Sequence, residues 1–295
     1  MSIAEEALEV KTGAKLQTKR IPLWPGIVLA ALLLLLYRHI LIALVQDWWN
    51  DPDFSHGFVV PLFSLFLLYR NRERLLATPE KPCWMGVLVT AAGLGTLIVG
   101  VMGAELFLSR VSGIMILAGI ILTFWGWQRL RVTAFPLLFL LFAIPIPTIL
   151  YNQITFPLQL LASQLAAALL PLFQVPVFRE GNVINLPAMP LEVAEACSGI
   201  RSLLSLGALA VIYGYFLEKS IPKRIILALA SVPIAVAANA ARIVGTGVCV
   251  QYWDPNKAMG FFHEFSGWVI FLFSVVILGI VQKALSLAGA RKGSA

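Results

Sequence analysis

Residues 191–205, LEVAEACSGIRSLLS, bring two carboxylates, a cysteine, a Ser-Gly step and an arginine together directly before a long apolar run. Charged residues make up only 13% of the chain, so this polar density at the start of an apolar helix needs an explanation. Cys197 lies near the first turn of the predicted helix, where backbone N–H groups and the helix dipole favour the thiolate. Arg201 lies four residues on, on the same helical face, and adds positive charge. The alternative is a buried structural cysteine beside an interfacial arginine.

The composition of the whole chain places these residues in a membrane protein. Of the 295 residues, 59% are hydrophobic, and the mean hydropathy of +0.87 is far above that of a soluble domain. The apolar stretches leave no soluble domain of typical size. The sequence therefore predicts a single all-α polytopic membrane domain over residues 1–295, with its function built from helices and their connections.

Charge and cysteine content exclude several other classes. The net charge of +7 could suggest nucleic acid. However, the basic residues cluster between the apolar runs, which is typical of membrane topology, and no nucleic-acid motif accompanies them. Three cysteines without a CxxC pair give neither a disulfide framework nor a metal-binding pattern, so we expect no metal and no other cofactor.

Basic residues orient eight predicted spans and place both chain ends, residues 1–22 and 284–295, in the cytoplasm. The loop QDWWNDPDFSHG has no Lys or Arg and is expected outside, whereas RNRER, Arg129 and Arg131 mark cytoplasmic turns. No small-residue cleavage site follows the first apolar run, so this run is predicted to be an uncleaved span. The spans are predicted at about residues 23–45, 58–69, 84–101, 106–127, 132–150, 199–217, 223–248 and 262–282.

One more apolar run, residues 156–173, leaves a choice. If it spans the membrane, the basic turn at residues 219–224 falls outside; if it lies in the interface or re-enters, that turn falls in the cytoplasm. We adopt the second interpretation because the charge bias outweighs one apolar segment interrupted by polar residues. Residues 151–196 then form an outer-face segment, in which VPVFREGNVINLPAMPLEV predicts a short hairpin before Cys197.

Three chemically complementary side chains are expected at one depth in the membrane. At 1.5 Å per helical residue, Cys197, Arg242 and His263 lie about 33, 27 and 30 Å from the cytoplasmic ends of their helices, each close to one hydrocarbon thickness. Acyl transfer uses such groups. A cysteine attacks a peptide carbonyl, a histidine protonates the leaving amine and later activates the incoming nucleophile, and an arginine stabilises the oxyanion or orients the substrate.

Each of these residues has an alternative interpretation. Arg242 could be a snorkelling arginine, but Asn239 before it and two glycines at positions 245 and 247 indicate a polar, closely packed face. His263 could be an interfacial ring, with His56 as the rival base, although a loop would hold His56 less firmly than a helix holds His263. Cys249 is the rival thiol or a disulfide partner, without the charged, helix-starting surroundings of the first cysteine.

Two other functional classes are therefore open. A transporter or channel for a lipid-linked or exopolysaccharide precursor would line an anion path with Arg38, Arg201 and Arg242. A membrane thiol–disulfide oxidoreductase would use Cys197 and Cys249. A transporter should tolerate Cys197→Ala, an oxidoreductase needs both cysteines, and a transpeptidase needs one.

Four short motifs in a fixed order resemble the exosortase/archaeosortase family. They are DFSHG in the first outer loop, EACSGIRS at 195–202, NAARI at 239–243 and HEFSGW at 263–268, and the resemblance covers essentially the whole chain. It implies a multispanning cysteine transpeptidase of the bacterial inner membrane with its site at the outer, periplasmic face. The implied partners are membrane lipid and exported proteins with a C-terminal sorting signal, which consists of a Pro-Glu-Pro type motif, a transmembrane helix and a basic tail.

The resemblance also assigns individual residues. The family's catalytic cysteine, arginine and histidine fall on Cys197, Arg242 and His263, and the implied reaction proceeds through a thioester. Water, a lipid amine or a glycan could accept the acyl group. A substrate-binding or supporting role is expected for the polar residues in the same motifs, which are Glu195, Ser198, Arg201, Asn239, Ser55 and His56.

Overall fold

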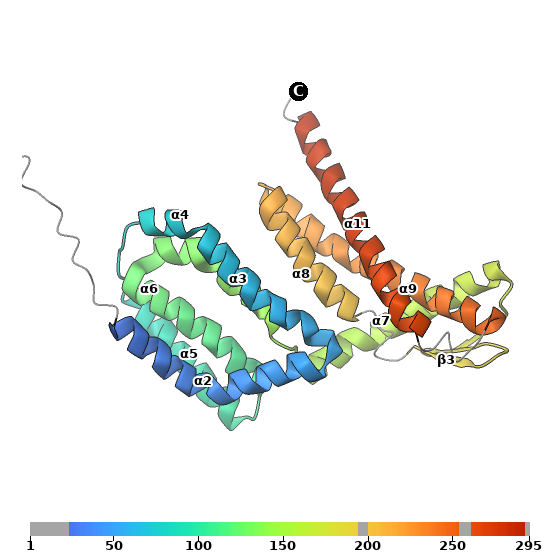
Figure 1. The fold of residues 1–295 in the computed structure, drawn as a ribbon, viewed down its shortest axis with the longest axis horizontal. Coiled ribbons are helices and arrows are strands. Elements are labelled where there is room, and N and C mark those ends of the chain that lie inside the picture. The colour runs from blue at the N-terminus through green and yellow to red at the C-terminus, as the bar shows by residue number, and fades with distance from the viewer. Residues whose placement is uncertain (1–23, 194–199, 254–260, 293–295) are drawn as a thin grey trace, which may run out of the picture. The chain divides into compact units, whose positions relative to one another are not determined.

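The computed structural model describes residues 24–193, 200–253 and 261–292, apart from the side chains of residues 261–264 and 289–292, and these residues are mostly helical (Figure 1). A boundary between Leu41 and Ile42 divides the chain into two compact units. Helix α2 (Trp24–Asn50) crosses this boundary. Every contact between elements described below lies within the second unit.

The described part of the chain contains eight helices that are long and apolar enough to cross a membrane, which confirms the predicted all-α polytopic class. They are Trp24–Asn50, Pro52–Arg70, Met85–Met102, Leu106–Ala143, Thr148–Phe173, Ile200–Leu217, Ile221–Tyr252 and Phe265–Ala288. The eight predicted spans differ from this set at two places. Residues 106–143 form one helix, where the sequence predicted two spans. The helix at residues 148–173 is also long and apolar enough to cross a membrane, although the sequence interpretation did not include it among the spans.

The elements after α2 follow in a simple order. The first half of the second unit contains η1 (Pro52–Phe58), α3 (Val59–Arg70), α4 (Arg72–Ala77), α5 (Met85–Met102), α6 (Leu106–Phe139) and η2 (Leu140–Ala143). The second half contains α7 (Thr148–Leu169), η3 (Leu170–Phe173), β1 (Phe178–Glu180), β2 (Val183–Asn185), β3 (Pro190–Glu192), α8 (Ile200–Leu217), α9 (Ile221–Tyr252) and α11 (Phe261–Lys292).

Helix α5 packs closely along the first part of α6, side by side with it in Figure 1. Glycines make this approach possible, as small residues do between membrane helices. A Cβ atom on Gly93 would collide with Ile116, and one on Gly119 would collide with Thr90. Gly95, on the same helix, has nothing within 4 Å of its Cβ position among the described residues, so the close approach depends on particular glycines.

The turn between the fourth and fifth predicted spans lies at a different residue from the one expected. The sequence placed it at Arg129 and Arg131, but the two helical segments of α6 meet at Gly126, with φ 81° and ψ −176°. Only glycine adopts a positive φ here without strain, and a Cβ atom would also collide with the carbonyl of Lys81. The second segment ends at Phe139 rather than near residue 150, because a Pro-rich stretch separates it from α7.

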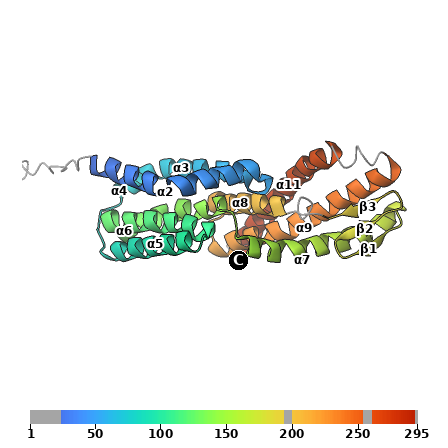
Figure 2. The same cartoon turned by 90° about the horizontal axis from the view of Figure 1, so that it is seen from below.

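A small antiparallel sheet follows α7. The predicted hairpin is present as β1 and β2, with Gly181 at φ 62° in its turn, and β3 adds a third strand in the order β1-β2-β3. The strands lie beside α7 and the end of α9 (Figure 2). The buried residues of this sheet cluster are Ala162, Ala166, Leu170, Val175, Ile184, Leu186, Leu191, Val193, Ile243, Val244 and Val250.

The position of residues 156–173 relative to the membrane stays a prediction. These residues form most of α7 and all of η3, and the segment is long enough to span. Its partners on α9 are Ile243, Val244 and Val250, which all follow Arg242 in the chain. If Arg242 lies at the outer interface, α7 packs against the part of α9 beyond that interface.

Helices α8, α9 and α11 pack against each other around a core of Leu206, Ala210, Leu227, Ala235 and Leu278. Their cytoplasmic ends are predicted near the buried Glu218, whose Oε1 accepts a hydrogen bond from Gln282 Nε2 at 3.1 Å. Its backbone carbonyl accepts a hydrogen bond from Arg224 Nε at 2.8 Å. These contacts fix the turn between α8 and α9 and tie it to α11.

Candidate active site

The described residues contain part of the predicted site. Glu195, Cys197 and Ser198 lie outside the described residues, and so does the side chain of His263, whose backbone belongs to the first turn of α11. The five remaining predicted residues, which are Arg201, Arg242, Asn239, Ser55 and His56, define the geometry that follows.

Arg242 lies between two helices. Its Nη2 donates a hydrogen bond to Oδ1 of Asn239 at 2.8 Å, one turn earlier on α9, and Asn239 is buried. On the α11 side, a Cβ atom added to Gly267 would lie 3.6 Å from Nη1 of Arg242. Gly267 is four residues after His263, which is one helical turn on the same face. The guanidinium therefore lies one turn from the backbone of His263.

The start of α8 lies level with this pair. Along the α8–α9 contact, Gly214 lies against Arg224 and Gly207 is closest to Ser231. A step of seven residues toward the N-terminus of α8 thus corresponds to a step of seven residues toward the C-terminus of α9. The two helices are therefore antiparallel. Continued by seven more residues, the same register pairs Ile200, the first residue of α8, with Ala238, the residue before Asn239.

The glycines near Arg242 behave differently from each other. A Cβ atom on Gly247 would lie 3.0 Å from Leu170, so this glycine allows the close approach predicted from the sequence. Gly245 is exposed, and none of the residues that the structure describes comes within 4 Å of a Cβ atom there. The closely packed face after Arg242 is therefore made by Gly247 and not by Gly245.

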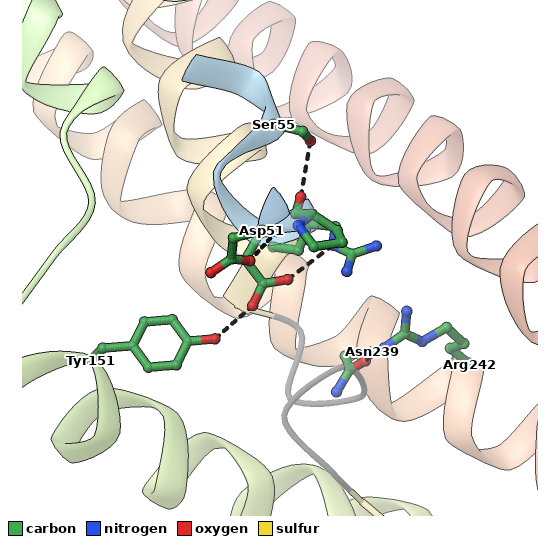
Figure 3. A network of polar contacts seen from close by, with 8 residues as sticks. Asp51, Ser55, Tyr151, Asn239 and Arg242 are labelled. Atoms are coloured by element: carbon green, nitrogen blue, oxygen red, sulfur yellow. Dashed lines mark hydrogen bonds and ion pairs between the residues drawn. The ribbon is translucent and has the colours of Figure 1, made fainter. Parts of the chain in front are cut away.

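A second polar cluster joins Arg201 to Asp53 and Tyr151. Nε of Arg201 donates to Oδ1 of Asp53 at 2.9 Å, and the hydroxyl of Tyr151 donates to Oδ2 at 2.6 Å. Figure 3 shows the Tyr151 hydroxyl directed toward the two carboxylates at the start of η1, with Asn239 and Arg242 on a separate helix. Sequence reasoning did not identify Asp53 or Tyr151, although Asp-Pro-Asp is a signal for a capped helix start.

The segment η1 is held in place by several contacts. Oδ1 of Asp51 accepts a hydrogen bond from the N–H of Asp53 at 2.9 Å and caps the helix. The Trp48 ring packs on Gly57, where a Cβ atom would collide with it, and Trp48 Nε1 donates to the carbonyl of Ala143 at 2.7 Å. Glycine at position 57 is therefore required by this close approach.

His56 is fixed more firmly than the sequence suggested. It lies in the 3-10 helix η1, and its Nε2 is 3.0 Å from the carbonyl oxygen of Phe142. Because that oxygen can only accept, Nε2 carries the proton and donates. The expectation that a loop would leave this ring loosely held was wrong, since the ring is anchored to η2. Ser55, next to it, is exposed, and its hydroxyl donates to the carbonyl of Pro52 at 2.9 Å.

His56 also borders an apolar cavity. The cavity has a volume of about 200 Å³. Apart from the histidine, its lining is hydrophobic: Phe54, Leu141, Phe142, Ile144, Ile146 and Leu204. Nδ1 of His56 is buried without a hydrogen-bond partner among the described residues. The hydrogen bond from Nε2 to the carbonyl of Phe142 therefore fixes the orientation of the ring.

These features define a class of protein: a polytopic helical membrane protein with one polar cluster between α9 and α11 and a second that joins η1 to the first turns of α7 and α8. The family model described as transmembrane exosortase (Exosortase_EpsH) matches residues 48–280, a stretch that contains all nine predicted site residues. The chain belongs to the transmembrane exosortase family. No curated protein and no solved structure matches it.

Proposed function

We propose that this protein is a membrane-embedded cysteine transpeptidase that removes the C-terminal sorting signal of exported proteins through a thioester intermediate. Membership of the exosortase family supports a membrane transpeptidase that acts in protein sorting. In this proposal, the Cys197 thiolate attacks the scissile carbonyl, the C–N bond breaks, and the leaving amine takes a proton from His263. An acceptor then attacks the thioester and releases the thiolate.

The position of Arg242 is the observation that carries the proposal. Asn239 holds one nitrogen of the guanidinium, and the other terminal nitrogen faces α11 at Gly267. A planar guanidinium with a fixed orientation can hold a developing oxyanion with little reorganisation during the reaction. In the register between α8 and α9, the start of α8, three residues after Cys197, pairs with Ala238, one helical turn before Arg242, and this supports a site near the guanidinium.

The proposed location follows from the distribution of basic residues. Both chain ends would lie in the cytoplasm, and the starts of α8 and α11 and the part of α9 around Arg242 would lie at the outer face of the bacterial inner membrane. The substrate's own transmembrane helix would then pack laterally against the protein. This arrangement would place the scissile bond at the outer interface, next to Arg242.

The oxidoreductase alternative needs Cys249 as a second reactive thiol, whereas the transpeptidase does not. Cys249 is a free thiol, partly buried against the sheet cluster. We therefore expect Cys249→Ala to process substrate normally, whereas an oxidoreductase would lose activity with either cysteine.

The direct test uses an exported reporter that ends in a Pro-Glu-Pro type motif, a transmembrane helix and a basic tail. The reporter is incubated with the purified enzyme in liposomes, and mass spectrometry of its new C-terminus identifies water, a lipid amine or a glycan as the acceptor. Wild type should cut the reporter, and Cys197→Ala should accumulate but leave it intact. Equal cutting by Cys197→Ala and wild type would overturn the proposal.

A further inference from the structure

One buried carboxylate connects three separate parts of the chain. Asp53 is 7% exposed, and each of its oxygens accepts a hydrogen bond, one from Arg201 and the other from Tyr151. The donors lie 148 and 98 residues away, on α8 and α7 respectively. The side chain of Asp53 therefore joins η1 to the first turn of α8 and to the first turn of α7.

The geometry of this connection is well defined. Hydrogen bonds that involve an ionised group are shorter and stronger than neutral ones, and a buried carboxylate with two donors has few other orientations. The segment that carries Asp53 is itself anchored, by the Asp51 cap, by Trp48 on Gly57 and by His56 on the carbonyl of Phe142. The start of α8 is thus tied to a rigid support.

The Asp53 contact also changes the role expected for Arg201. The sequence suggested a positive charge that favours the thiolate of Cys197. In the structure Arg201 is paired with a carboxylate at 2.9 Å, although half of its side chain remains exposed. A paired guanidinium contributes a smaller net field at a neighbouring thiol than an isolated one does. Its clearest physical effect is to hold the start of the helix.

We propose that Asp53 is a positioning residue for the transpeptidase reaction. It fixes Arg201, and through Arg201 the first turn of the helix that follows Cys197, while Tyr151 orients the carboxylate. This inference rests on the proposed function, because its consequence is measured as turnover at Cys197. A merely structural ion pair would affect the amount of folded enzyme and not the rate of each folded molecule.

The test compares single and double variants at equal amounts of folded protein. Asp53→Asn and Arg201→Gln should each lower kcat about 100-fold with KM changed less than threefold, since misplacement of a catalytic group by about 1 Å typically has this effect. Because the two residues act as one unit, the double variant should also lose about 100-fold, not the product of the two. Tyr151→Phe removes one hydrogen bond to the carboxylate and should lose about 10-fold. The matched control is Asp51→Asn, which makes the same charge change two residues away, keeps a capping side chain and should retain wild-type kcat.

A second measurement does not depend on catalysis. Hydrogen exchange at the amides of the first turn of α8 should be about tenfold faster in Asp53→Asn and Arg201→Gln than in wild type, and unchanged in Asp51→Asn. If Asp53→Asn fails to accumulate, Arg201→Gln and Tyr151→Phe provide the same comparison. Wild-type kcat in Asp53→Asn, or a loss in the double variant equal to the product of the two single losses, would overturn the positioning role of Asp53. Cys197→Ala would still test the proposed function separately. If wild type itself leaves the reporter intact, the proposed function fails, and unchanged exchange in Asp53→Asn would separately overturn the inference.

Discussion

Replacing Gly267 tests whether the orientation of Arg242 matters for catalysis. A Cβ atom at this position would lie 3.6 Å from Nη1 of Arg242, which is ordinary van der Waals contact. Gly267→Ala should therefore fit and keep wild-type turnover to within about threefold, with a gain in helix propensity of up to about 1 kcal/mol. The leucine side chain in Gly267→Leu has three more carbon atoms than the alanine side chain. These atoms would occupy the position of the Arg242 guanidinium. The protein should still fold, because the displaced group is the far end of a flexible side chain.

The expected magnitude follows from the role of the displaced group. Loss of one oxyanion donor typically lowers kcat by about 100- to 1,000-fold, so we expect a loss in this range for Gly267→Leu. The matched control is Gly279→Leu on the same helix, because no atom of the described residues lies within 4 Å of a Cβ atom there. The assay is reporter cleavage under single-turnover conditions, with the folded fraction measured by gel filtration in detergent. Wild-type turnover in Gly267→Leu would refute the role given to Arg242.

Three further predictions follow from the same geometry. Arg242→Lys should lose much of the activity, up to about 1,000-fold in kcat, because an ammonium cannot bind Asn239 and an oxyanion with the fork of a guanidinium; near wild-type kcat would reduce Arg242 to a membrane anchor. Gly126→Ala should reduce thermal stability and membrane accumulation, because of its positive φ and the Lys81 carbonyl, whereas Gly95→Ala, which faces open space, should not; equal melting temperatures would contradict the kink. A membrane-impermeant maleimide should label Cys83 only after lysis of spheroplasts and should label Cys249, where accessible, before lysis; the opposite pattern would contradict the topology.

Local patterns in the sequence were sufficient for much of the fold. Apolar runs and basic turns predicted the polytopic class, and β-branched residues around Glu-Gly-Asn predicted the hairpin that forms β1 and β2. The three-residue spacing of Asn239 and Arg242 indicated a shared polar face, and the two side chains are hydrogen-bonded. These features depend on residues close together in the chain, where the helical or strand period fixes their relative direction.

The features that the sequence did not indicate depend on distant residues or on a single backbone angle. Arg201 and Asp53 are 148 residues apart, and no local period brings them together. His56 was expected in a loose loop because its anchor, the carbonyl of Phe142, is 86 residues away. Gly126 was passed over because the charges at Arg129 and Arg131 gave a stronger signal for the turn, whereas the sharp bend needs a residue without a Cβ atom.

The most direct test of the proposed chemistry is to trap the acyl-enzyme. Enzyme and reporter are mixed, quenched in acid and digested, and the peptide that contains Cys197 is analysed by mass spectrometry with and without hydroxylamine. The account predicts a hydroxylamine-sensitive adduct on Cys197 in wild type and Cys249→Ala. The adduct should be absent in Cys197→Ala and His263→Ala, whereas His56→Ala should form and resolve it at a reduced rate. Cleaved reporter without any adduct on Cys197, or an adduct that forms and resolves normally in His263→Ala but not in His56→Ala, would contradict the account.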